Sequence, residues 1–193
     1  PRCINYALKK YGIKPVPIER LKRYIGHHLE DIFAQITGRK DKKFLKSCVD
    51  AYRERFHKEG IPEHRLYPGI VGLLEAVSVK GNVVVATNKP EVSCKMVLDH
   101  LGISKYFTKI YGLESVKGKN CKTTLLKEVI KKERLKDATV VGDRAMDVEA
   151  AKKCKFRAVG VSYGYGTKDE LSGAGADIVA ETVGELRQHL LNY

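Results

Sequence analysis

Residues 139–147 read Thr-Val-Val-Gly-Asp-Arg-Ala-Met-Asp, and this stretch decides the fold class. The apolar run at residues 138–141 predicts a short buried strand, and residues 147–153 predict a helix directly after it. The same alternation of strands and helices continues on both sides, from Leu66 to the C-terminus. Such alternation indicates an α/β fold, here a Rossmann-like three-layer core with a parallel sheet.

The chain divides into two regions of different character. From residue 66 onward, strands are expected at residues 82–86, 109–111, 138–141, 157–161 and 177–179, and helices at 70–77, 91–101, 123–132, 147–153, 169–174 and 183–191. Residues 1–65 contain no convincing strand, and their apolar residues recur at helical spacing over 5–11, 18–24, 29–37 and 41–58. We therefore predict a core domain at residues 66–193 and a small all-helical domain at residues 1–65.

Asp143 and Asp147 are the first candidate site residues. They are four residues apart at a strand–helix junction, which predicts that both lie on one face of the start of the helix. Such hard oxygen ligands suit Mg²⁺, which binds through one or two protein carboxylates and keeps several waters. The alternative is a pair of ordinary acids favoured by the helix dipole.

Two further segments carry candidate residues. Thr87 and Asn88 follow the predicted strand at 82–86, where a hydroxyl and a backbone N–H could bind an oxyanion, although such residues also commonly cap the next helix. Lys119 and Lys122 precede or begin the helix at 123–132, where the helix dipole disfavours a cation. A lysine there suggests a nearby anion, and a solvated lysine is the alternative.

Composition narrows the class of protein. No apolar run approaches the ~20 residues that span a bilayer, and no signal peptide opens the chain. The five cysteines are scattered without a CxxC pair, which argues against a disulfide framework or a zinc site and favours a cytoplasmic protein. The net charge is +13. Its lysines are spread over many helices without interleaved aromatic residues, so the sequence does not favour a nucleic-acid partner.

The three segments together resemble the motifs of one known family. Ala86-Thr-Asn-Lys-Pro90, Lys122-Thr-Thr-Leu-Leu126 and Gly142-Asp-Arg-Ala-Met-Asp147 are similar, in this order, to the second, third and fourth motifs of haloacid dehalogenase-like phosphatases. The resemblance extends over essentially the whole chain, including the segment 160–166 that is followed by Glu170-Leu171. It is closest to the branch with phosphoglycolate phosphatases and nucleotidase-like relatives. The helical residues 1–65 resemble the cap domain of this family.

The resemblance implies roles for these residues. Thr87 and the Asn88 backbone would hold the transferring phosphoryl group, and Lys122 would neutralise the phosphate, with Lys119 as its rival. Asp143 would bind Mg²⁺, and Asp147 would bind the metal or hold its water. The expected partner is a small phosphorylated metabolite, and the expected assembly is a monomer or a homodimer.

The family's first motif is absent from residues 1–193. In relatives, a strand ending in Asp-x-Asp-Gly-Thr supplies the nucleophile and the general acid/base, and it precedes a helix that resembles residues 4–13. The resemblance places this strand between the strands at 82–86 and 138–141. We therefore expect that it lies upstream of Pro1. The alternatives are another chemistry of the same family (mutase, dehalogenase or phosphonatase) and a binding protein that has lost its nucleophile.

Overall fold

The computed structural model describes residues 1–113 and 121–192. The chain forms two compact units, Pro1–His64 and Arg65–Tyr193, each with a hydrophobic core of its own. No helix in the described ranges is long and apolar enough to cross a lipid bilayer. All five cysteines are free thiols.

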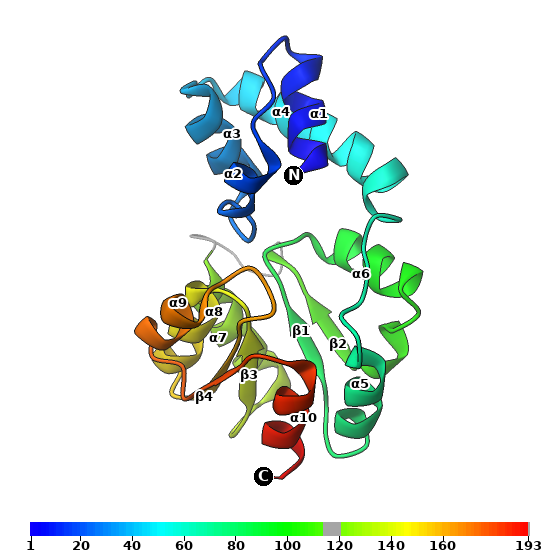
Figure 1. Ribbon diagram of the computed structural model, residues 1–193, viewed down its shortest axis with the longest axis vertical. Coiled ribbons are helices and arrows are strands. Elements are labelled where there is room, and N and C mark those ends of the chain that lie inside the picture. Colours follow the sequence, from blue (N-terminus) through cyan, green and yellow to red (C-terminus); the bar gives the residue numbers. More distant parts are fainter. Residues whose placement is uncertain (114–120, 193) are drawn as a thin grey trace. The chain divides into compact units, whose positions relative to one another are not determined.

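The first unit is helical throughout (Figure 1). Its elements are α1 (Arg2–Lys10), α2 (Ile18–Lys22), α3 (Leu29–Thr37), α4 (Lys42–Arg55) and the π-helix η1 (Phe56–Gly60). Leu8, Leu21, Phe33 and Cys48 have no exposed side-chain surface and form the centre of its core. Asp41 caps α4 by accepting hydrogen bonds from the two backbone N–H groups at residues 43 and 44, which fixes where that helix begins.

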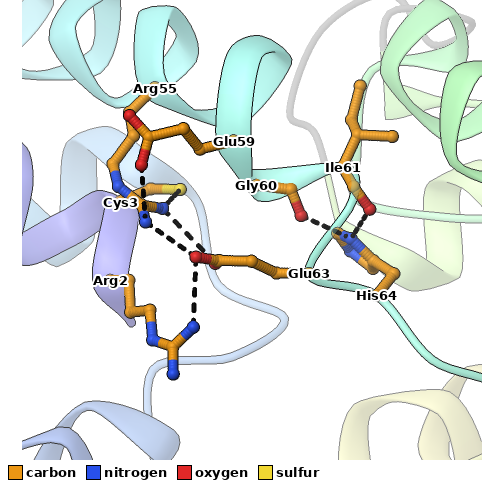
Figure 2. A network of polar contacts seen from close by, with 8 residues as sticks. All are labelled: Arg2, Cys3, Arg55, Glu59, Gly60, Ile61, Glu63 and His64. Atoms are coloured by element: carbon orange, nitrogen blue, oxygen red, sulfur yellow. Dashed lines mark hydrogen bonds and ion pairs between the residues drawn. The ribbon is translucent and has the colours of Figure 1, made fainter.

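A polar network joins the beginning and the end of this unit (Figure 2). The guanidinium of Arg55, near the end of α4, binds Oε1 of Glu63 at 2.7 Å, and Arg2 binds the same oxygen at 3.1 Å. Arg55 also donates to the buried Sγ of Cys3 at 3.2 Å. The Arg55 hydrogen bond, followed by that of Arg2, outweighs partial burial and lowers the pKa of Glu63 to about 2. These contacts tie the first turn of α1 to the segment that leaves the unit.

The second unit alternates strands and helices (Figure 1). The elements are α5 (Ile70–Ser78), β1 (Val84–Ala86), α6 (Glu91–His100), η2 (Ser104–Tyr106), β2 (Lys109–Tyr111), α7 (Lys122–Glu133), β3 (Thr139–Gly142), α8 (Ala145–Lys153), β4 (Arg157–Val161), α9 (Lys168–Gly173), β5 (Ile178–Ala180) and α10 (Val183–Leu191). All strand pairs are parallel. The fold is α/β and Rossmann-like, as the alternation predicts.

Helices cover both faces of β4, which makes this part of the unit three-layered. On one face, Val159 and Val161 pack with Leu73 of α5 and Leu186 of α10. On the other face, Ala158 packs with residues of α8 and with Leu171 of α9. Because successive side chains of β4 point to opposite faces of the sheet, they belong to two separate apolar clusters.

The strands form two sheets, and β1 and β3 lie in different ones. One sheet has the order β1-β2 and the other β3-β4-β5. Among the described strands, β1 pairs with β2 alone and β3 with β4 alone. The prediction that both strands are buried is wrong here: β1 is half-buried throughout, and Val141 in β3 is 40% exposed. As far as the structure describes the chain, each of these two strands has a neighbouring strand along one edge only, so cross-strand contacts cover its side chains on that edge and not on the other.

Candidate functional site

Three segments that are distant in the sequence meet at the carboxyl ends of β1 and β3. The ammonium of Lys122, the first residue of α7, donates to the carbonyl oxygen of Ala86, the last residue of β1, at 2.8 Å. The same ammonium forms an ion pair with Oδ1 of Asp147 in α8 at 2.9 Å. Nδ2 of Asn88 donates to Sδ of Met146 at 3.6 Å. The end of β1 thus contacts α7, and the loop after it contacts α8, although β1 and β3 belong to different sheets.

Lys122 is the central residue of this arrangement. Its side chain is 16% exposed and that of Asp147 is 13% exposed, so the pair is largely removed from solvent. The anion that a lysine at a helix start requires is therefore present in the protein itself. An ammonium has three N–H donors, and two of them have partners among the described residues. Within the part of the chain that the structure describes, the third donor has no partner and could bind an anion.

Thr87 and Asn88 lie in the loop that follows β1. The backbone N–H of Thr87 donates to the carbonyl of Tyr111 at 2.9 Å and so extends the β1–β2 pairing by one residue. Oγ1 of Thr87 accepts from the N–H of Lys89 at 3.1 Å, and the hydroxyl hydrogen can still donate to a ligand. The N-cap of α6 is Pro90. The alternative that Thr87 or Asn88 caps this helix is therefore wrong.

Asp143 occupies the turn between β3 and α8, and one sequence-based expectation about it needs correction. The helix begins at Ala145, so Asp143 and Asp147 do not share a helix face. Oδ2 of Asp143 accepts from the backbone N–H of Tyr165 at 2.9 Å, and its carbonyl accepts from the N–H of Gly166 at 2.8 Å. Within the described parts of the chain, Oδ1 of Asp143 accepts no hydrogen bond. One carboxylate oxygen is held in place while the other can bind a ligand.

Asp147 lies in the first turn of α8, as the third residue of that helix. Its Oδ2 accepts from the backbone N–H of Arg144 at 3.2 Å, and its Oδ1 binds Lys122. The first of these contacts belongs to a capping box that closes the beginning of the helix. Asp147 therefore stabilises the helix start and holds the ammonium at once.

Three glycines permit this close packing. A Cβ atom on Gly142 would lie 2.2 Å from Cβ of Asp147, and one on Gly164 would lie 2.4 Å from Cβ of Asp143. A Cβ atom on Gly166 would lie 2.3 Å from the carbonyl oxygen of Asp143. Real Cβ atoms do not approach other atoms this closely. The two carboxylates can thus occupy their positions only because these residues have no side chain.

Replacing Gly142 tests this packing. We expect Gly142→Ala in the full-length protein to reduce the free energy of unfolding by about 2 kcal/mol, a value typical of overpacking. Gly81→Ala is the matched control, because Gly81 is exposed and a Cβ atom there would meet nothing within 4 Å. Urea denaturation followed by circular dichroism measures both variants. Equal midpoints for the two variants would contradict the close approach of Gly142 to Asp147.

The residues of this site fit a hard divalent cation better than a zinc ion. Within the described ranges, no group of three or more His, Cys, Asp or Glu side chains is placed to hold a metal. One or two carboxylates are nevertheless the protein ligands that Mg²⁺ commonly uses. Oδ1 of Asp143, which accepts no hydrogen bond from the described residues, could serve as one ligand, and Asp147 would contribute the second carboxylate. Lys119, the rival lysine, lies outside the described residues.

Sequence reasoning assigned no role to several side chains around Asp143. The rings of Tyr67 and Tyr163 meet edge to face at 5.1 Å between their centroids. Burial, and then the proximity of Tyr67 and Asp143, raise the pKa of Tyr163 to about 12. Near the other side of the turn, Arg144 forms an ion pair with Glu170 at 2.9 Å. Nothing local in the sequence marks these contacts, because each joins residues from different elements.

Comparison with known proteins shows extended similarity. A sequence model of the haloacid dehalogenase-like hydrolases matches residues 2–161. A 5'-nucleotidase of Pseudomonas aeruginosa is 34% identical over 88% of this chain and 78% of that protein. A phosphoglycolate phosphatase of Aquifex aeolicus is 30% identical over 84% of this chain and 76% of that protein. The crystal structure of a predicted phosphatase from Clostridium acetobutylicum is 31% identical and has a TM-score of 0.89, covering 100% of this chain and 90% of that one.

Proposed function

Because the chain belongs to the haloacid dehalogenase-like hydrolase family, we propose that the full-length protein is a magnesium-dependent phosphatase of a small phosphomonoester. One observation carries the proposal: Lys122 joins the end of β1 to Asp147, and among the described residues its third N–H donor has no partner, so it could bind an anion. A cation fixed at the carboxyl ends of parallel strands is suited to a dianionic phosphoryl group. The names of the relatives support a phosphoglycolate-like or nucleotide-like substrate.

Each residue of the site would have a distinct task. The Thr87 hydroxyl and the Asn88 backbone N–H would bind oxygens of the phosphoryl group, and Lys122 would offset its charge. Asp143 and Asp147 would hold Mg²⁺. The metal, when bound, would neutralise charge on the phosphoryl oxygens in the transition state. Asp147 would in addition keep the Lys122 ammonium pointed at the substrate.

The nucleophile would come from a strand between β1 and β3. We propose that this strand carries two aspartates two residues apart, as in the family's first motif. The first carboxylate would attack phosphorus to form an aspartyl-phosphate, while the second would protonate the departing alcohol oxygen. Water, deprotonated by the second carboxylate, would then release inorganic phosphate. The two separate sheets of this unit support the proposal, because each offers one strand edge for such a partner.

We propose further that the helical unit Pro1–His64 acts as the cap that selects the substrate. Its independent core allows it to move as one body. The free thiols support a location in a reducing compartment such as the cytoplasm. The partner would be a small phosphorylated metabolite rather than a nucleic acid.

The test of the proposed function is the removal of the lysine. We expect Lys122→Ala in the full-length protein to reduce the turnover of a generic phosphomonoester by about 10²–10³, the typical cost of losing one preorganised charge donor. Lys119→Ala is the matched control and should change turnover far less. Steady-state release of inorganic phosphate measures both. The opposite ranking would show that Lys119 is the phosphate-binding lysine, and normal turnover of both variants would remove the basis of the proposal.

A further inference from the structure

Glu170, in the first turn of α9, contacts the turn that separates the two carboxylates of the site. Its Oε1 accepts from Nε of Arg144 at 2.9 Å and from the backbone N–H of Ala145, also at 2.9 Å. Arg144 and Ala145 directly follow Asp143, and Ala145 begins the helical turn that contains Asp147. A single carboxylate oxygen therefore binds both the side chain before α8 and the first N–H of that helix.

The position of Glu170 is itself well fixed. The hydroxyl of Thr167 caps α9 by accepting from the N–H of Glu170 at 3.1 Å. The next residue, Leu171, has no exposed surface and packs below β4. A Cβ atom on Gly160 of β4 would lie only 3.0 Å from Leu171, so helix and strand are in close contact. Glu170 thus extends from a rigid base to α8.

The contact is favourable for the helix that receives it. The N–H of Ala145 is among the first four of α8, which have no acceptor within the helix. A carboxylate at this end also interacts favourably with the helix dipole, and its bond to a guanidinium is charge-assisted. The side chains of Arg144 and Glu170 are 16% and 28% exposed, so solvent screens this pair only in part.

The loop that leads into α9 holds Asp143 from the other side. The N–H of Tyr165 binds Oδ2 of Asp143, and the N–H of Gly166 binds its carbonyl. Four residues later, Glu170 binds Arg144 and Ala145. Residues 165–170 thus contact the 143–145 turn at three successive residues, which leaves its backbone little freedom.

We infer that Glu170 is a positioning residue: by holding Arg144 and the N–H of Ala145, it fixes the turn that sets Asp143 against Asp147. This inference rests on the proposed function only for its consequence, the affinity of the two carboxylates for magnesium. Residues that orient metal ligands through hydrogen bonds commonly change metal affinity by 10–100-fold when replaced. Glu170 would act in this way without touching substrate or metal.

The experiment compares two neighbouring acids of α9 in the full-length protein. Glu170→Ala removes both contacts, and Glu170→Gln keeps a neutral acceptor of the same shape but loses the charge. Asp169→Ala and Asp169→Asn are the matched controls, because Asp169 is exposed in the same helical turn and forms no hydrogen bond or ion pair with the described residues of α8. Hydrogen exchange of the Ala145 amide, calorimetric titration with MgCl₂, and the magnesium concentration for half-maximal activity are measured for each.

For Glu170→Ala we expect exchange of the Ala145 amide to rise about tenfold and the dissociation constant for magnesium to rise at least about tenfold. The substrate KM at saturating magnesium should stay within about twofold, and Glu170→Gln should be intermediate. If Glu170→Ala does not fold, the same comparison of Ala145 amide exchange and magnesium affinity is made with Glu170→Gln, which preserves the shape of the side chain. Exchange equal to that of the Asp169 variants would overturn the inference. A wild-type protein that neither binds magnesium nor hydrolyses phosphoesters would refute the proposed function, whereas amide exchange would still decide the role of Glu170.

Discussion

Asp143→Asn in the full-length protein is expected to lower phosphatase turnover by at least about 10³ while leaving the fold intact. A bound metal stabilises transition-state charge by several kcal/mol, and each 1.36 kcal/mol corresponds to about a tenfold change in rate. Asparagine keeps an oxygen that can accept from the N–H of Tyr165, so the turn should retain its shape. What is lost is the negative charge beside the open Oδ1 position. Phosphate release at saturating substrate, over a range of MgCl₂ concentrations, measures the effect.

The control for this variant is Asp137→Asn. Asp137 is an exposed acid that precedes β3, whereas Asp143 follows it, so the two lie at opposite ends of the same strand. Both variants remove one charge, and only Asp143→Asn should lose activity. The melting temperatures of both should agree with that of the wild type within a few degrees. Near-normal turnover of Asp143→Asn would show that this carboxylate does not bind the metal.

The second large effect concerns the strand that we place between β1 and β3. Residues 1–193 expressed alone should be inactive and should unfold without a sharp cooperative transition. Val141 is 40% exposed and β1 is half-buried, so without the intervening strand apolar side chains of both strands stay in contact with water and lose the free energy of burial. Adding the upstream coding sequence, on the order of 15–20 residues at ~3.3 Å per strand residue, should restore both cooperativity and magnesium-dependent hydrolysis.

A matched variant separates the two roles of this segment. The upstream segment with both of its expected aspartates replaced by asparagine should restore cooperative unfolding but not hydrolysis. Urea denaturation and phosphate release are measured for the three proteins. If residues 1–193 alone are stable and hydrolyse phosphoesters, the proposed nucleophile is wrong. If they are stable and inert, and no such segment precedes them in the gene, a binding protein without a nucleophile becomes the better interpretation.

Much of the secondary structure could be predicted because its causes are local. The helix at Leu29–Thr37 and the strands at Lys109–Tyr111 and Arg157–Val161 have the predicted bounds. Their apolar spacing and flanking breakers are properties of the segment itself. The start of helix α8, in contrast, depends on a residue that is distant in the sequence. Predicted from Asp147, the helix begins at Ala145, because an acceptor from a distant helix, Glu170, satisfies the first N–H.

The residues of the candidate site could be chosen from the sequence, whereas the contacts between them could not. The order of the three segments, and the choice of Thr87, Asn88, Lys122, Asp143 and Asp147, follow from the sequence and its family resemblance. That Lys122 binds Asp147, and that Asp143 stands outside the helix, depends on packing between β1, α7 and α8. The distance between two side chains from different elements is set by the cores beneath them.

The sequence by itself determined that residues 66–193 alternate strands and helices, that residues 1–65 are helical, and that acids and a lysine follow the strands. These outcomes depend on period, local propensity and turn residues, which act over a few positions. Only the tertiary structure decided that β1 and β3 belong to separate sheets. The same holds for the close approach of the Asp147 side chain to Gly142 and for the hydrogen bond from the first N–H of α8 to Glu170. Hydrogen bonding and close packing between distant segments decide these features, and no local pattern records them.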